Sequence, residues 1–127
     1  MFSHVTVGTN DLAKAKAFYD ALLRPLGVER RADQPTGSGY GPAVGRLPLW
    51  IVMPLDKKPA SVGNGFTVGL DAPDRPSVDA AYKAGMQAGG TSEGEPGLRP
   101  HYHPNYYGAY LRDPDGNKVC IVCHKEL

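Results

Sequence analysis

An internal repeat constrains the fold of this chain more than any other feature. Residues 4–27 (HVTVGTNDLAKAKAFYDALLRPLG) align without gaps with residues 67–90 (TVGLDAPDRPSVDAAYKAGMQAGG) when one is shifted by 63 positions. The shift superposes residues of the same kind, namely Asp11 on Asp74, Tyr19 on Tyr82 and Gly27 on Gly90. Matching residues in the same order indicate two copies of one unit, a short strand followed by a helix.

Each helix is predicted from its boundary residues and its apolar face. Asp11 and Asp74 are good N-caps, Pro76 suits a first helical turn, and Gly27 suits the end of a helix. Apolar residues recur at helical spacing in both copies, as Ala15, Phe18, Tyr19 and Leu22, and as Val78, Ala81, Tyr82 and Met86. Each helix should therefore bury one face.

A glycine-rich stretch and an apolar strand follow each helix, with the strands at 47–53 (LPLWIVM) and 117–123 (NKVCIVC). With seven extra residues in the second half, Trp50 corresponds to Cys120. This order predicts two β-α-β-β-β repeats in an α+β fold, with curved sheets around a cleft and helices outside. We expect a single domain over residues 1–127, with repeats over about 1–60 and 61–127. An unrelated two-layer α+β sandwich is the alternative.

Composition excludes several classes of protein. The 127 residues are 41% hydrophobic and 21% charged, which is typical of a globular domain. The net charge of +1 gives no long-range attraction for nucleic acid or an anionic membrane. We find no apolar run long enough to cross a bilayer and no secretory signal at the N-terminus, so we expect a cytoplasmic protein.

The segment from Arg99 to Tyr107 (RPHYHPNYY) concentrates polar and aromatic side chains. Its two prolines favour an extended shape, in which His101 and His103 would point to the same side. The segment is predicted to form a wall of the cleft, with an anion contact from Arg99. The alternative is a structural loop that covers a sheet edge or a dimer contact.

At this point the chain resembles the vicinal oxygen chelate superfamily, the group of glyoxalases, bleomycin resistance proteins and extradiol dioxygenases. The resemblance rests on His4 in the first strand, on NDLAKAKAFYDALLRPLG, on the second strand and helix, and on DPDGNKVCIV near the end. The stretch PGLRPHYHPNYYGAYLRDPDGN resembles a glyoxalase-like bacterial subgroup with no single agreed activity. The resemblance covers nearly the whole chain and implies a small-molecule ligand and a homodimer.

The resemblance also implies a divalent metal, Zn, Ni, Mn or Fe, at the bottom of the cleft. The family draws His, Glu or Gln ligands from the first and last strands of each repeat, and the matching positions here are His4, Trp50, Thr67 and Cys120. Only His4 is a usual ligand, with the Cys120 thiolate as a second candidate and His101 or His103 as a third. Stable sites need three or four converging ligands, so we expect no tightly bound metal. The missing carboxylate also argues against glyoxalase I activity.

The residues at the metal-ligand positions leave two classes of function open. One is a metal-dependent lyase, isomerase or dioxygenase acting on a small oxygenated metabolite. The other is metal-free sequestration of a small aromatic or cationic compound, of the bleomycin-resistance type. In both cases the predicted pocket is lined by His4, Trp50, Thr67, Arg99, His101, His103, Tyr106, Tyr110 and Cys120.

The two cysteines do not form a metal clip or a redox pair on an intact strand. Cys120 and Cys123 are three residues apart, and residues three apart in a strand face opposite sides. Cys123 is predicted to be a small buried hydrophobic residue or an edge residue, and Cys120 to point into the cleft. Its thiol is then a soft metal ligand, a reactive group, or the mark of a site that has lost its metal, and we favour the last.

Overall fold

The computed structural model describes residues 1–127 and contains two helices, a short 3₁₀ turn and eight strands. The first half contains β1 (Val5–Gly8), α1 (Leu12–Leu23), the 3₁₀ turn η1 (Arg24–Leu26), β2 (Glu29–Gln34), β3 (Gly37–Gly41) and β4 (Leu49–Val52). The second half contains β5 (Thr67–Asp71), α2 (Arg75–Gln87), β6 (Thr91–Leu98), β7 (Tyr107–Arg112) and β8 (Lys118–Cys123).

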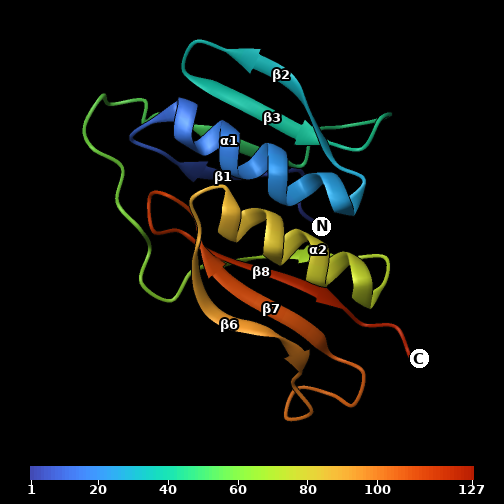
Figure 1. Ribbon diagram of the computed structural model, residues 1–127. Coiled ribbons are helices and arrows are strands. Elements are labelled where there is room, and N and C mark those ends of the chain that lie inside the picture. The colour runs from blue at the N-terminus through green and yellow to red at the C-terminus, as the bar shows by residue number, and fades with distance from the viewer.

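Each half folds into its own four-stranded sheet with the same topology. The strand orders are β1-β4-β3-β2 and β5-β8-β7-β6, and in each sheet the first pair is parallel and the others antiparallel. The two sheets lie one above the other in Figure 1, with α1 and α2 side by side in front of them. The predicted α+β fold, with two β-α-β-β-β repeats and the helices outside, is confirmed, and the sandwich alternative is not observed.

Both helices begin as the sequence predicts. The side chains of Asp11 and Asp74 accept hydrogen bonds from backbone N–H groups three residues later, which satisfies donors that a helix start leaves free. The two helices pack closely because Gly85 has no side chain. A Cβ there would lie 2.7 Å from Cδ1 of Leu22.

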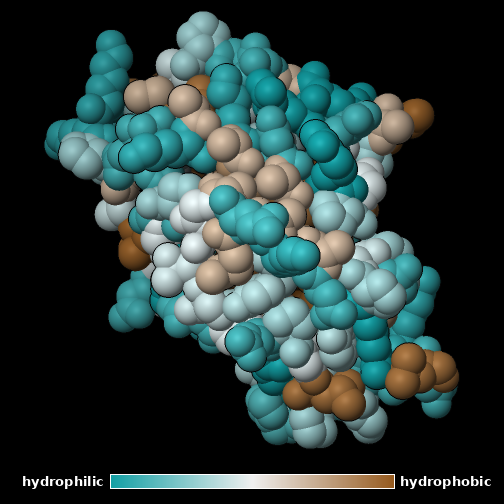
Figure 2. Space-filling model, in the orientation of Figure 1, coloured by the Kyte–Doolittle hydropathy of each residue, from teal (hydrophilic) through white to brown (hydrophobic).

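The hydrophobic core lies between the helices and the sheets. All four residues of the first predicted apolar face are buried, and in the second Val78 and Ala81 are buried while Tyr82 and Met86 pack against the core. Cys123 belongs to this core. On the helix side, moderately apolar side chains gather in the middle of a mostly hydrophilic surface, and the few strongly hydrophobic ones lie at its edge (Figure 2).

The Asp-Pro-Asp-Gly-Asn turn between β7 and β8 joins the two halves. The buried Asp113 carboxylate accepts hydrogen bonds from the Tyr19 hydroxyl at 2.6 Å and from the Asn117 side chain at 2.9 Å. The same Asn117 amide donates to the backbone oxygen of Gly8 at 2.9 Å, and Asp115 accepts from the Thr9 hydroxyl at 2.5 Å. This turn, on which part of the family resemblance rests, thus has a structural role in fastening the repeats together.

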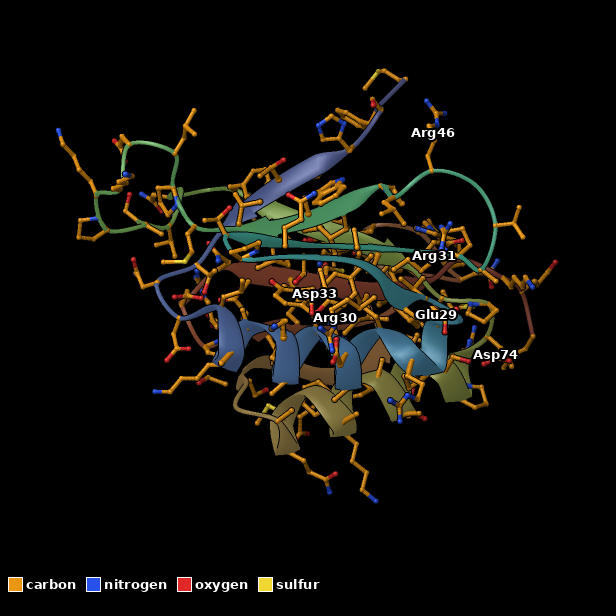
Figure 3. All side chains as sticks on the ribbon, turned by 90° about the horizontal axis from the view of Figure 1, so that it is seen from above. Glu29, Arg30, Arg31, Asp33, Arg46 and Asp74 are labelled. Atoms are coloured by element: carbon orange, nitrogen blue, oxygen red, sulfur yellow. The ribbon has the colours of Figure 1, made fainter.

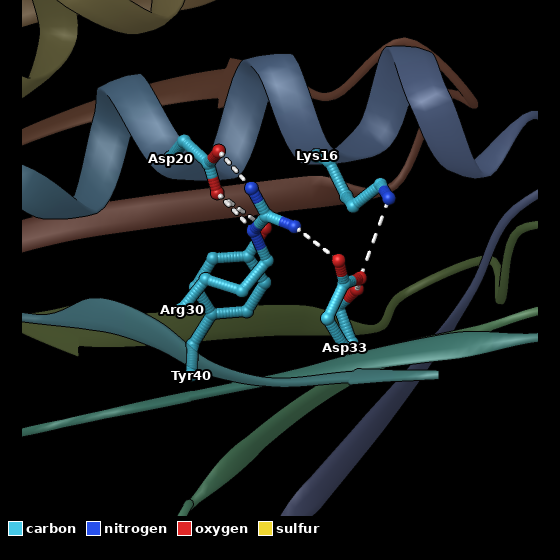
Figure 4. Close-up of polar contacts among 6 residues, drawn as sticks. Lys16, Asp20, Arg30, Asp33 and Tyr40 are labelled. Carbon is cyan, nitrogen blue, oxygen red and sulfur yellow. Dashed lines mark hydrogen bonds and ion pairs between the residues drawn. The ribbon is translucent and has the colours of Figure 1, made fainter. Parts of the chain in front are cut away.

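A second polar network ties α1 to β2 on the outer surface. Arg30 and Asp33 point from β2 towards α1 (Figure 3). Arg30 bonds Asp20 through two nitrogens and Asp33 at 2.7 Å, and Tyr40 donates to Asp20 at 2.8 Å (Figure 4). Exposed ion pairs of this kind stabilise a protein by at most about 1 kcal/mol each. We assign this network to packing of the first half.

Candidate functional site

The candidate site is a hollow of about 390 Å³ on the face of the second sheet that the helices do not cover. Its residues come from β5, β7, β8, the loop before β7 and the residue after β8. They are Thr67, Gly69, Tyr102, Tyr106, Tyr110, Lys118, Cys120, Val122 and His124. A volume of this size suits a small organic molecule.

Alternation along β8 builds the floor of the hollow. Lys118, Cys120 and Val122 line it, while the intervening residues and Cys123 lie in the core. The two cysteines therefore face opposite sides, as strand geometry requires. Both are free thiols.

Gly69 keeps the floor open beside Cys120. It pairs with Cys120 across the parallel β5–β8 ladder, and no atom lies within 4 Å of the place where its Cβ would stand. Any larger residue at this position would extend into the hollow.

Two tyrosine hydroxyls and the Cys120 thiol form a hydrogen-bonded chain. The Tyr106 oxygen lies 2.7 Å from the Tyr110 oxygen and 3.4 Å from the Cys120 sulfur. Burial, followed by the interaction with Cys120, raises the pKa of Tyr106. Burial, followed by the bond to Tyr106, raises the pKa of Tyr110. Both tyrosines are therefore neutral hydrogen-bond donors at ordinary pH and not bases.

The segment before β7 forms two tight turns and is not extended as the sequence suggested. The backbone N–H of Tyr102 donates to the oxygen of Arg99 at 3.0 Å, and that of Tyr106 donates to the oxygen of His103 at 3.2 Å. These local bonds outweigh the preference of the prolines for an extended chain. They bring the rings of Tyr102 and Tyr106 to 4.8 Å from each other, beside the hollow.

Arg99 and the two histidines of this segment lie outside the lining of the hollow. The Arg99 guanidinium donates to the backbone oxygens of Gly97 and Glu95, both at 2.9 Å, and lies over the Tyr110 ring at 5.6 Å. It thus packs against the Tyr110 ring. His101 is exposed and its ring packs against Tyr102 at 4.3 Å.

His103 pairs with His124, a residue that the sequence analysis did not single out. The backbone N–H of Asn105 donates to Nδ1 of His103, so in the neutral ring Nε2 carries the proton and donates to Nδ1 of His124 at 2.8 Å. His103 therefore holds His124 at the edge of the hollow.

The equivalent face of the first sheet is filled by its own side chains. Trp50 is half-buried, donates to the backbone oxygen of Leu47 at 3.1 Å, and lies against Gly39, where a Cβ would meet its ring at 2.9 Å. His4 is exposed, bonds the Ser3 hydroxyl at 2.9 Å, and lines a separate hollow of about 260 Å³ between β1 and β5. Gly69 lines both hollows.

The donor set does not fit the divalent metal that the family implies. No three His, Cys, Asp or Glu side chains converge on one point in the structure. Of the four matching positions, Trp50 offers no ligand, Thr67 offers a weak one, and His4 and Cys120 line different hollows.

The structure thus brings four of the nine predicted site residues into one hollow: Thr67, Tyr106, Tyr110 and Cys120. The other five lie elsewhere: His4, Trp50, Arg99, His101 and His103. Sequence reasoning missed Lys118 and Val122, although the two-residue alternation from Cys120 along β8 would have found both.

Two strand-helix-sheet modules with their helices packed together define a class of small α+β domains. The profile of the Glyoxalase/Bleomycin resistance protein/Dioxygenase superfamily matches residues 1–121. The chain belongs to this superfamily. A search of curated proteins gives no match.

Solved structures agree with this assignment. A glyoxalase/bleomycin resistance protein from Albidiferax ferrireducens T118 is 43% identical, with a TM-score of 0.86 over 98% of this chain and 99% of that one. A putative glyoxalase from Bacillus halodurans is 26% identical, with a TM-score of 0.71 over 97% and 95% of the two chains. A lactoylglutathione lyase from Agrobacterium tumefaciens is 22% identical with a TM-score of 0.66, covering 97% and 92%, and supports the fold alone.

Proposed function

We propose that this protein binds a small organic molecule in the hollow of the second sheet, through side-chain hydrogen bonds and not through a chelated metal. The hydrogen-bonded group of Tyr106, Tyr110 and Cys120 is the observation that carries the proposal, because it surrounds Cys120, the position at which the resemblance implies a carboxylate ligand. Thr67, Lys118 and His124 are further polar residues of this hollow. Tyr102, Tyr106 and Val122 offer apolar contact to the rest of the ligand.

The chemistry of the hollow supports binding more than glyoxalase-type catalysis. Removal of a proton next to a carbonyl needs a base with a pKa near the working pH. Neither tyrosine meets this need, because the pKa of each is raised above its ordinary value by burial. The hollow has no carboxylate, and Nδ1 of His124 already accepts a hydrogen bond from His103. As neutral donors, the hydroxyls suit a ligand that presents carbonyl or carboxylate oxygens.

Metal content and ligand binding together test the proposal. Protein purified without a histidine tag is analysed for bound metal and then titrated with small aromatic carbonyl and carboxyl compounds, with and without EDTA. We expect no stoichiometric metal and binding that EDTA does not change. A stoichiometric metal that disappears in His4→Ala would contradict the proposal and favour a metal-dependent lyase, isomerase or dioxygenase.

Two conservative variants assign the binding to this hollow. Tyr106→Phe and Tyr110→Phe remove one hydroxyl each and keep the ring, so each should weaken binding by about five- to tenfold. Tyr82→Phe is the matched control, because its hydroxyl bonds Ser92 outside the hollow. Homodimerisation and a cytoplasmic location remain predictions from the resemblance and the composition.

A further inference from the structure

The lining of the hollow in the second sheet carries positive charge only. Its nine residues include the ammonium of Lys118 and no aspartate or glutamate. A hollow with a cation and without acids attracts anions and repels cations, since low-dielectric walls strengthen the field inside.

Lys118 is the main source of this charge and is not neutralised within the chain. The ion pairs of the structure engage Lys16, Arg30 and Arg112 but not Lys118. Glu93, on the neighbouring edge of the sheet, is held by Arg112 at 2.6 Å. The hydrogen bond from Arg112 lowers the pKa of Glu93, with a smaller contribution from Lys118, which acts at longer range.

The ammonium of Lys118 lies over the ring of one of the two hydrogen-bonded tyrosines. Lys118 Nζ lies over the Tyr110 ring, 5.4 Å from its centre. The Tyr110 oxygen lies 2.7 Å from that of Tyr106. One ammonium and a pair of hydrogen-bonded phenols thus border the same hollow, and the phenol that accepts within the pair keeps its own O–H for an incoming group.

We propose that the ligand of this hollow is a small organic anion, a carboxylate attached to a flat or apolar body. Lys118 takes the charge, and one hydroxyl of the Tyr106–Tyr110 pair donates to the carboxylate while the other O–H stays in the bond between the two tyrosines. The body lies against the ring of Tyr102 and against Val122. This inference rests on the proposed function, since it names the ligand class of the same hollow. It favours an anion over the cationic compound that the bleomycin-resistance comparison suggested.

The test compares ligands that differ in charge but hardly in shape. The probes are 4-hydroxybenzoate with 4-hydroxybenzamide, phenylacetate with phenylacetamide, and tyramine as a cation. Each is titrated into the full chain by isothermal calorimetry or by ligand-observed NMR. We expect the acids to bind at least about tenfold more tightly than their amides, because hydrogen bonds to a charged group are the stronger ones. Tyramine should bind no better than the amides.

Three variants assign the preference to Lys118. Lys118→Gln should lower the affinity for the acids about tenfold and leave the amides unchanged, and Lys118→Arg should keep most of the affinity. Lys83→Gln, on the exposed surface of α2, makes the same change in net charge outside the hollow and should have no effect. Each variant is first checked for an unchanged melting temperature.

The outcomes separate this inference from the function on which it rests. Equal affinity for acids and amides, or unchanged acid binding in Lys118→Gln, overturns the anion assignment while binding in the hollow stands. Binding of none of the probes to the parent protein counts against both. Tighter binding of tyramine than of the acids overturns the inference and restores the cationic alternative.

Discussion

Filling the hollow from its floor is the sharpest test that the structure offers, and Gly69→Ile is the variant for it. Gly69 lines the hollow and pairs with Cys120 in the β5–β8 ladder. No atom lies within 4 Å of its would-be Cβ, and its backbone is not in the left-handed region that favours glycine. The new side chain therefore meets no protein atom near its base and occupies space that a ligand would need.

The variant should separate stability from binding. Replacing a glycine at a position that accepts a side chain stabilises a protein by about 0.4–1 kcal/mol, mainly by restricting the unfolded chain, and β-branched residues suit strands. The melting temperature should stay constant or rise by a few degrees. Ligand affinity should fall at least about tenfold, which corresponds to about 1.4 kcal/mol of lost contact.

Calorimetric titration with a small aromatic carboxylate and a thermal melt measure the two effects on the same samples. Gly69→Ala serves as the graded control, because a single methyl group fills little of the hollow and should cost less affinity. The reasoning is refuted if Gly69→Ile binds the probe as tightly as the parent, since the ligand must then lie elsewhere. A large loss of stability would show that position 69 is not open.

The remaining predictions concern the fastening of the repeats and the two thiols. Tyr19→Phe leaves the buried Asp113 carboxylate with one hydrogen-bond donor fewer, so it should lower the free energy of unfolding by about 2 kcal/mol and the melting temperature by about 6 °C. Tyr40→Phe should cost less, because the Tyr40 hydroxyl bonds a less buried carboxylate. Equal losses in the two variants would contradict the role of Tyr19. Burial and the Asp113 charge hold the pKa of Tyr19 well above its usual value, so the folded state resists ionisation of this tyrosine. The neutral Tyr19 hydroxyl therefore stabilises the fold fully below about pH 10, and this stabilisation is lost at higher pH. In alkaline denaturation experiments the parent protein should lose stability more steeply than Tyr19→Phe. N-ethylmaleimide should modify Cys120 at least about tenfold faster than Cys123 in the native protein, as followed by peptide mass spectrometry, because only Cys120 lines the hollow; equal rates would contradict the assigned faces.

The fold followed from the sequence because its signals are local and repeated. The aspartate caps and the apolar helix faces depend on residues close in the chain, and the 63-residue shift shows the same local signals a second time. Both agree with the two sheets of identical topology. The opposite orientations of Cys120 and Cys123 follow from strand geometry alone.

The site was predicted less well because its shape depends on contacts between distant segments. Backbone hydrogen bonds fold the segment after Arg99 into turns, which place His101 away from the hollow. The Arg99 guanidinium donates its hydrogen bonds to backbone carbonyl oxygens of β6 instead of to a ligand. The Trp50 side chain could either line an open pocket or cover the face of its own sheet. Which of the two occurs depends on Gly39 on the neighbouring strand, which leaves room for the Trp50 ring. The sequence pattern carried none of these interactions.

Chemical-shift mapping of the isotope-labelled protein tests the central claim most directly. A small aromatic carboxylate is added in the presence of EDTA, and backbone and side-chain signals are followed. The account predicts shifts concentrated on Gly69, Tyr106, Tyr110, Lys118 and Cys120, with the same size when EDTA is omitted. Shifts centred on His4, or shifts that appear only after a divalent metal is added, would contradict it.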